Sequence, residues 1–291
     1  MFYVLYAFLW LIMWLPLPVI YVFSDLAWPI MYYVVRYRRR VVRDNLANSF
    51  PDKNVKELRR IERRFYRSFC DTMLESMYSI HMSRRELKRR FTYCNLELLD
   101  EALSRKQGCF VMTSHYGNYE WLTGAKLSME MDYPYFTVYR RLANRHFDKV
   151  MSDVRQRRHN INVEKRDLMQ VLEQNHRQGI RGIYGMIADQ KPSPKKPQYW
   201  YWTTFLNQDT AFLTGTEFLA RKYDYAVLYA HIERLGRGRY RCTLEWLSDE
   251  PRLCADNGIT EKYARLLERD LQQQPAYWLW SHKRWKYKRT V

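Results

Sequence analysis

The sequence predicts an α/β fold, in which a single mixed, largely parallel sheet is flanked by helices and preceded by an N-terminal membrane helix. Two observations predict it. Short apolar runs alternate with helix-like amphipathic segments along most of the chain, a pattern typical of strand–helix–strand units. No charged residue lies between Phe2 and Ser24. The 291 residues, 47% of them hydrophobic, suffice for one packed domain, so we expect an anchor at residues 1–35 and one folded domain at 36–291.

The N-terminal segment is long enough to cross a bilayer, which requires roughly 20 apolar residues. Pro16 and Pro18 would kink a helix, so either a bent span or a re-entrant hairpin reaching Val35 is expected. Basic residues flanking a span stay in the cytoplasm, where they can also hold anionic lipid headgroups. The folded domain is therefore predicted on the cytoplasmic side, because five arginines follow the segment: Arg36, Arg38, Arg39, Arg40 and Arg43.

The remaining elements follow from hydrophobic periodicity. Residues 41–92 are expected to be helical, with a break at 49–52 and Asp52 capping the second part. Further helices are expected at 96–103, 119–129, 143–157, 166–178, 211–222 and 260–273. Strands are expected at 109–114, 135–139, 161–163, 180–188, 225–232 and 240–246, the last two joined by a turn at 236–238. A proline-rich loop is expected at 190–201.

Charge and cysteine content limit the classes of binding partner and of metal site that are expected. The formal net charge of +18 indicates an anionic partner, such as a membrane, a phosphorylated substrate, an acidic protein or nucleic acid. The five cysteines have no disulfide or zinc spacing, so we expect reduced thiols and no metal site.

The best candidate for a catalytic group is His115, which follows a buried apolar run and precedes Gly117 and Asn118. Ligands bind at the carboxyl ends of strands in open α/β sheets, and a neutral imidazole can take up a proton near pH 7. Glu120, in the first turn of the next helix, can reach the other ring nitrogen and hold the tautomer. The start of that helix, at Asn118, offers backbone N–H groups to an anion.

Three details support this choice. Ser114 would point to the opposite face from His115, so the nucleophile is expected to be a hydroxyl of the substrate. The same spacing recurs at His81 and Glu86 and at His159 and Glu164, but both pairs lie in segments expected at the surface. Arg140 and Asp189 also follow predicted strands, and both would face the same crevice if the sheet is parallel.

Six blocks follow one another along the chain: Val42–Pro51, His115 with Glu120, Val138–Asn144, Ile187–Gln190, Phe205–Gly215 and Pro275–Lys286. Together they resemble the bacterial lipid A biosynthesis (lauroyl/myristoyl) late acyltransferases, within the wider lysophospholipid and glycerolipid acyltransferase group. The sequence departs from that family at Tyr229, where the family often has proline.

The resemblance implies a glycerolipid acyltransferase-like domain at the bacterial inner membrane. It implies transfer of a fatty acyl chain from an acyl thioester, on acyl carrier protein or coenzyme A, to a hydroxyl of a phosphorylated lipid A precursor, without a cofactor. His115 would be the general base and Glu120 its orienting partner. Arg140 would bind a phosphate or stabilise developing negative charge, and Asp189 would position Arg140 or the acceptor. Substrate binding is assigned to Arg140, Arg141, Asp189, Gln190 and Asn118.

Two alternatives remain at this point. The same chemistry could act on a glycerophospholipid, an aminoacyl lipid or a glycolipid. The chain could instead be a membrane-anchored nucleic-acid-binding protein, since aromatic and basic residues interleave after Trp278, although the same pattern also marks a membrane interface.

Overall fold

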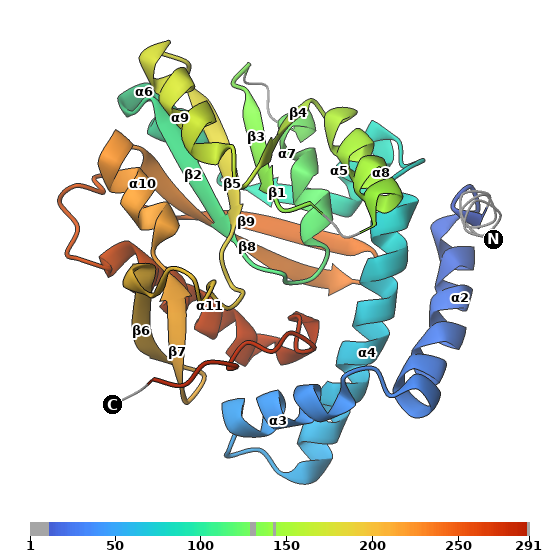
Figure 1. The fold of residues 1–291 in the computed structure, drawn as a ribbon. Helices are drawn as coiled ribbons and strands as arrows, with labels where there is room; N and C mark the ends of the chain where they lie inside the picture. Colours follow the sequence, from blue (N-terminus) through green and yellow to red (C-terminus); the bar gives the residue numbers. More distant parts are fainter. Residues whose placement is uncertain (1–11, 129–131, 142–143, 290–291) are drawn as a thin grey trace.

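A seven-stranded sheet forms the centre of the protein (Figure 1). The computed structural model describes residues 12–128, 132–141 and 144–289. The strands are β1 (Phe91–Cys94), β2 (Gly108–Thr113), β3 (Tyr135–Tyr139), β4 (Asn160–Glu164), β5 (Gly182–Ile187), β8 (Ala226–Gly236) and β9 (Arg239–Ser248), in the order β1-β9-β8-β2-β5-β3-β4. Neighbours are parallel except for the β8–β9 hairpin. The predicted α/β class and the largely parallel sheet are confirmed.

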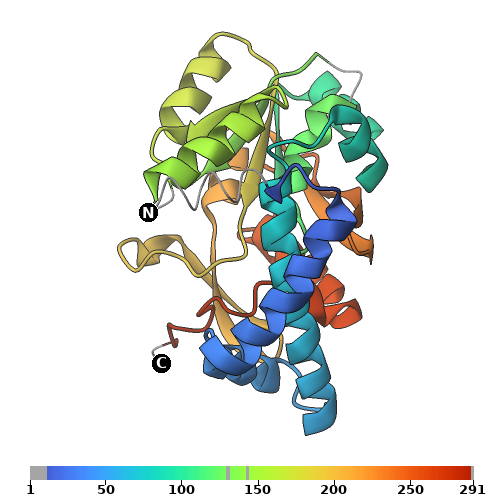
Figure 2. The ribbon, with the colours of Figure 1, turned by 90° about the vertical axis from the view of Figure 1, so that its right-hand side faces the viewer.

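Helices flank this sheet (Figures 1 and 2). In chain order they are α2 (Leu17–Pro29), the π-helix η1 (Ile30–Val35), α3 (Arg39–Ser49), α4 (Val55–Tyr78), α5 (Arg84–Arg90), α6 (Glu97–Arg105), the 3-10 helix η2 (Tyr119–Gly124), α7 (Ala125–Ser128), α8 (Arg145–Gln156), α9 (Leu168–Arg177), η3 (Pro197–Tyr199), α10 (Gly215–Tyr223), α11 (Gly258–Gln273) and η4 (Pro275–Tyr277). Helix α4 begins at a capping box formed by Asn54 and Glu57, so the predicted cap at Asp52 is wrong.

Strand β2 lies at the middle of the sheet, between β8 and β5, and all six of its residues are buried. Gly108 begins it where the ring of Tyr225 packs so closely that any Cβ would collide with it. A strand buried on both faces reads as a continuous apolar run, which is why the sequence predicts it within one residue at each end. Its carboxyl end lies beside the carboxyl ends of the parallel strands β5 and β3.

Three segments differ from the prediction. Strand β1 begins within the range expected to be helical, which ended at residue 92, because Phe91 is buried and pairs with Tyr240 of β9. The residues before α10 form a separate two-stranded hairpin, β6 (Trp200–Phe205) with β7 (Gln208–Leu213), so the helix predicted from residue 211 begins at Gly215. The helix predicted from residue 119 begins as the 3-10 helix η2, and its last predicted residue lies outside the described part of the chain, as does residue 143.

The N-terminal helices cover one flank of the domain. Within the described residues, one helical stretch, Leu17–Val35, is long and apolar enough to cross a membrane by length and composition. This N-terminal apolar helix is confirmed as an element, while residues 1–11 of the predicted anchor lie outside the described part of the chain. Figures 1 and 2 show α2 running alongside α4, with α3 crossing at one end.

The segment after α11 returns to the middle of the molecule. Tyr116 forms a β-bridge with Trp278, and Asn45 of α3 donates to the carbonyls of Trp280 (2.8 Å) and His282 (3.0 Å). Trp280 is fully buried. This return segment, residues 278–286, therefore joins the carboxyl edge of the sheet to the N-terminal helices.

Candidate active site

His115 and Asp189 meet because their strands are neighbours in register. In the β2–β5 pairing Thr113 lies opposite Ile187, and each candidate residue stands two positions beyond its strand. The Nδ1 atom of His115 lies 2.7 Å from Oδ1 of Asp189, and the backbone N–H of His115 donates to Oδ2 at 3.0 Å. The two side chains thus form a His–carboxylate pair at the carboxyl edge of the sheet.

Both oxygens of Asp189 are held by fixed donors. The indole N–H of Trp278 donates to Oδ2 at 2.7 Å, and Asp189 is 2% exposed. Trp278 stands within the C-terminal block of the sequence analysis, but no pattern along the chain indicated that it contacts Asp189. A buried carboxylate with its lone pairs occupied keeps one orientation, so the return segment fixes the acidic partner of His115.

The charges of the pair shift both pKa values. Burial alone would raise the pKa of Asp189, but the charge of His115 and the hydrogen bonds from His115 and Trp278 hold that pKa below its ordinary value. Burial alone would lower the pKa of His115, but the charge and hydrogen bond of Asp189, together with the charge of Glu120, raise it. The resting pair is therefore a carboxylate facing an imidazole that binds a proton more readily than a free one.

The other ring nitrogen of His115 is available for proton transfer. If Nδ1–H donates to Asp189, Nε2 carries the lone pair, and the side-chain N–H of Gln190 reaches it at 3.1 Å. Gln190 is exposed, so a substrate hydroxyl can take its place beside Nε2. The ring of Tyr119 packs edge-on against His115, with 4.8 Å between the ring centroids, and limits its rotation.

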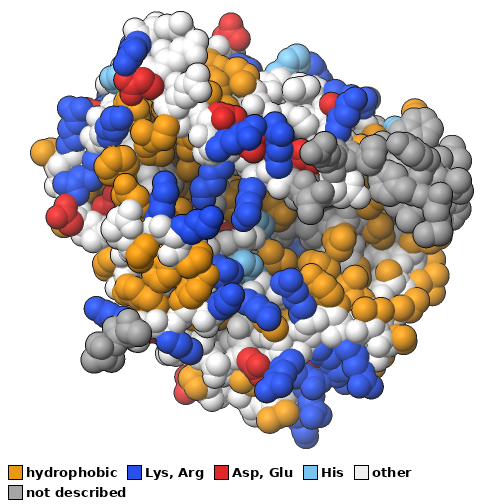
Figure 3. Space-filling view, in the orientation of Figure 1, with side chains coloured by type: hydrophobic (Ala, Val, Ile, Leu, Met, Phe, Trp, Pro, Cys, Tyr) orange, Lys and Arg blue, Asp and Glu red, His pale blue; other side chains and the backbone are white. Residues whose placement is uncertain are grey.

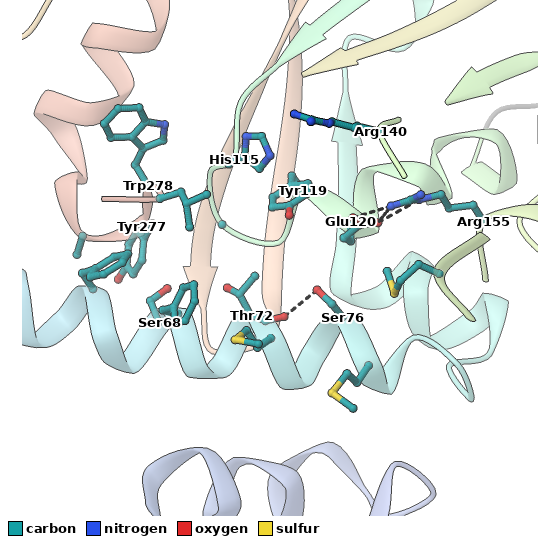
Figure 4. A pocket seen from close by; sticks show the side chains of 18 residues that line it. Ser68, Thr72, Ser76, His115, Tyr119, Glu120, Arg140, Arg155, Tyr277 and Trp278 are labelled. Atoms are coloured by element: carbon teal, nitrogen blue, oxygen red, sulfur yellow. Dashed lines mark hydrogen bonds and ion pairs between the residues drawn. The ribbon is translucent and has the colours of Figure 1, made fainter. Parts of the chain in front are cut away.

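Glu120 does not take the role expected from the spacing. Its carboxylate accepts hydrogen bonds from two nitrogens of the Arg155 side chain, Nη2 at 2.8 and 3.0 Å and Nε at 3.3 Å. Figure 4 shows Glu120 turned toward Arg155 while His115 points the other way. The expected hydrogen bond from Glu120 to His115 is thus replaced by one from Asp189, and Glu120 contributes its charge from the same pocket.

The local backbone explains why Glu120 turns away. The carbonyl of Glu120 accepts from Thr123 Oγ1 (2.7 Å) and from Arg158 (3.1 Å), and the carbonyl of Thr123 accepts from Asn160 (2.6 Å). Side chains of β4 and of the turn before it thus occupy acceptors that an α-helix would use for its own i→i+4 bonds. The turn becomes a 3-10 helix, which directs Glu120 toward α8.

The other predicted binding residues separate into two groups. Arg140 directly follows β3, is exposed, and extends toward His115 over the pocket (Figure 4). Arg141 forms an ion pair with Glu164 at 2.9 Å. Asn118 is fully buried, donating to Glu75 at 3.0 Å and capping η2. The structure therefore places Arg140 at the pocket, whereas the side chains of Arg141 and Asn118 contact Glu164 and Glu75.

A cavity of about 250 Å³ opens in front of His115. One wall is polar and contains His115, Glu120, Arg140 and Arg155, whereas the opposite wall is a largely apolar face of α4 (Figure 4). The apolar α4 side chains in this wall are Phe65, Phe69, Met73 and Met77, and the small polar residues Ser68, Thr72 and Ser76 lie among them. The sequence indicated their helical periodicity but not that they face a cavity. Tyr229, where the sequence departs from the family pattern, donates to Asp270 on α11.

The basic and aromatic residues near the C-terminus are structural. Trp278, Trp280 and Arg284 are 2%, 0% and 3% exposed, and Arg284 donates to the carbonyl of Ala211 at 2.7 Å. His282 accepts the backbone N–H of the residue after Gln190 at 3.3 Å, and burial lowers its pKa to about 4. These four side chains are therefore held inside the protein, whereas Lys283, Lys286 and Lys288 of the same segment are exposed.

The comparisons with known proteins agree with the geometry. Among the described residues, no group of three or more His, Cys, Asp or Glu side chains could hold a metal ion. A family model described as bacterial lipid A biosynthesis acyltransferase matches residues 1–287. None of the curated proteins matches the chain.

Proposed function

The chain belongs to the bacterial lipid A biosynthesis acyltransferases, and we propose that it transfers a fatty acyl chain from an acyl carrier protein thioester to a hydroxyl of a lipid A precursor. One observation carries the proposed mechanism. A buried carboxylate holds His115 Nδ1 at 2.7 Å, which leaves Nε2 facing a cavity with one polar and one apolar wall.

In the proposed reaction the acceptor hydroxyl displaces Gln190 and donates its proton to Nε2 of His115. The hydroxyl oxygen attacks the thioester carbonyl, and the tetrahedral intermediate collapses with loss of the thiolate. The thiolate then takes the proton from the His115 imidazolium, so the base is regenerated and an ester is formed. Asp189 stabilises the imidazolium between the two transfers, as the acidic member of a hydrolase triad does.

The cationic groups beside the cavity suit a phosphorylated acceptor. Burial and then the positive charges of Arg140 and Lys196 lower the pKa of Lys165. When an anion binds between neighbouring cations, it reduces the repulsion among them. We therefore assign the acceptor phosphate to Arg140, with Lys165 and Lys196 beside it.

The apolar wall and the net charge suit the acyl donor. Phe69, Met73 and Met77 provide a surface on which an acyl chain can be buried, and methionine adapts to flexible ligands. The formal charge of +18 would accelerate the encounter with an acidic carrier protein and make the rate sensitive to salt.

The direct test is acyl transfer from radiolabelled acyl carrier protein by membranes containing the wild type or His115→Ala. Removal of a general base should lower the rate roughly 10²–10⁴-fold. His176→Ala is the matched control, since His176 ends α9 ahead of the amino end of β5 and should retain full activity. A lipid mass profile of a deletion strain identifies the acceptor; intact lipid A with another lipid class lacking a chain would refute the acceptor.

A further inference from the structure

The N-terminal helices α2 and η1 pack against α4 through a series of contacts between Tyr21 and Tyr32. The two run antiparallel, and Met31 Sδ of η1 lies 4.0 Å from Cys70 Sγ of α4. Four further pairs follow one another along the helices: Tyr21 OH with Glu75 (2.7 Å), Ser24 Oγ with Asp71 (2.6 Å), Asp25 with Arg67 (3.0 Å) and the rings of Tyr32 and Tyr66 (5.3 Å between centroids). All the hydroxyl and carboxylate groups of α2 therefore face the domain.

This docking is incompatible with a helix that crosses a bilayer. The stretch Leu17–Val35 has 19 residues, which at 1.5 Å per residue span about 28 Å, close to the hydrocarbon thickness. If it crossed while docked, α4 would lie at the same depth. Arg67 of α4, whose side chain is 55% exposed, pairs with Asp25 near the middle of Leu17–Val35, and ionised side chains are costly at the bilayer centre.

The face of α2 and η1 that points away from α4 is apolar and is left exposed by the described part of the chain. Its side chains are 40–74% exposed and recur at helical spacing: Val19, Val22, Phe23, Leu26, Ile30 and Val34. Asp25, the one charged residue of Leu17–Val35, is paired with Arg67 and Arg237. Figure 3 shows hydrophobic side chains along this flank and a group of basic side chains at its lower end.

Charge complementarity identifies what covers this face. Where η1 ends, Arg36, Arg38 and Arg40 are exposed, and the first two adopt positive φ (53° and 48°) as the chain turns into α3. An apolar helix face bordered by arginines at one end is typical of a helix lying in the interface of an anionic membrane. A protein partner of such uniform apolarity would need no adjoining cations.

We propose that α2 and η1 form an interfacial helix, docked on α4 by their polar face and immersed in one leaflet by their apolar face, instead of crossing the bilayer. This rests on the proposed membrane location but not on the proposed reaction. One consequence concerns the lipid acceptor. Since α4 lies between this helix and the cavity (Figure 4), and Met73 is 49% exposed, an acyl chain can pass beside α4 into the cavity without leaving the leaflet.

The first experiment tests the docking in the membrane. Met31→Cys places a second thiol beside native Cys70, and a mild oxidant or a short bismaleimide should join them in native membranes as it does in detergent. Val34→Cys is the matched control, because Val34 is 74% exposed on the outward face and should not cross-link to Cys70. Loss of the Met31→Cys link in membranes but not in detergent would indicate a detached, spanning helix. Absence of the link from both preparations would refute docking.

The second experiment tests what the outward face contacts. Leu26, Arg63 and Leu253 are replaced in turn by photo-reactive benzoylphenylalanine, and the full chain is irradiated on phosphatidylethanolamine–phosphatidylglycerol vesicles. Position 26 should form lipid adducts at least tenfold more often than position 253, a leucine between β9 and α11 that is more exposed still (82% against 62%). No excess at position 26 would refute the membrane contact, and equal labelling at position 63 would show that both helices are immersed. Neither readout involves acyl transfer, so both should be unchanged in the His115→Ala chain.

Discussion

Asp189→Asn tests the His–Asp pair most sharply, because the structure fixes how the new amide must orient. Two donors, the backbone N–H of His115 (3.0 Å) and the indole N–H of Trp278 (2.7 Å), point at Oδ2. The asparagine carbonyl must accept both of them, since the NH₂ group cannot. That choice places the NH₂ group at the Oδ1 position, 2.7 Å from His115 Nδ1.

An N–H donor at this position reverses the tautomer of His115. Nδ1 must accept, so the proton moves to Nε2 and the base is occupied before the substrate arrives. Loss of the correct tautomer should lower kcat by roughly 10³–10⁴-fold. Because the replacement is isosteric, the protein should fold, although losing charge-assisted hydrogen bonds costs about 1.5–3 kcal/mol of unfolding free energy.

The pH dependence provides a second readout. In the wild type the rate should fall as the pH drops through the pKa of His115, which Asp189 holds above its ordinary value of about 6.5. Without the carboxylate the His115 pKa decreases, so the residual activity of Asp189→Asn should have its acid limb at lower pH. Single-turnover acyl transfer between pH 5 and 9, with unfolding monitored separately, measures both effects. A rate within fivefold of wild type with an unmoved acid limb would refute the reasoning.

Trp278→Phe removes one hydrogen-bond donor from Asp189, so the negative charge of the carboxylate is less compensated and attracts the His115 proton more strongly. The acid limb should therefore move to higher pH, opposite to Asp189→Asn, with up to about a tenfold loss of kcat; a shift to lower pH would contradict the clamp. Glu120→Gln leaves Arg155 without its carboxylate and should cost about 3 kcal/mol of unfolding free energy. Its rate should exceed that of Asp189→Asn, and an equal loss would return Glu120 to the role expected from the spacing. Arg140→Ala should lower kcat/KM for a phosphorylated acceptor about 10–100-fold, equivalent to about 1.4–2.8 kcal/mol, whereas Arg141→Ala should change it less than twofold; equal effects would count against Arg140 as the phosphate ligand.

The pair also links stability to pH with a defined sign. Because the pKa of Asp189 is lowered in the fold, Asp189 stabilises the fold above its unfolded pKa of about 3.9, and this stabilisation is lost as the pH falls through the folded pKa. Because the pKa of His115 is raised, His115 stabilises the fold below its unfolded pKa of about 6.5, and this stabilisation is lost as the pH rises through the folded pKa. Their combined contribution is therefore greatest between about pH 4 and 6.5.

Local patterns predicted what depends on local physics. The fully buried strand β2 reads as an apolar run, so the sequence placed His115 at a strand end correctly. The partner of His115 was predicted from proximity along the chain, and this failed because Arg158 and Asn160 bind backbone carbonyls of residues 119–124, which form a 3-10 helix. The actual partner, Asp189, depends on β2 and β5 being neighbours, which is a non-local choice of strand order.

The same limit applies to single strands and side chains far from the site in sequence. Strand β1 lies in a basic, helix-like stretch, and only its pairing with β9 makes it a strand. Trp278 and the apolar wall of α4 became part of the site through long-range packing. Periodicity indicates that a face is apolar, but not whether it meets a core, a cavity or a lipid.

The return segment also determines when the newly synthesised chain becomes catalytically competent. Asn45 and Trp280 are 235 residues apart in sequence, and the contact between Trp278 and Asp189 spans 89 residues. Closing such long loops is slow compared with forming the β8–β9 hairpin. A nascent chain that already contains residues 1–270 has both His115 and Asp189 but lacks the indole that fixes the carboxylate. Full catalytic competence should thus be acquired late in synthesis, after the chain has had time to reach the membrane, and incomplete chains should transfer acyl groups more slowly than the full chain.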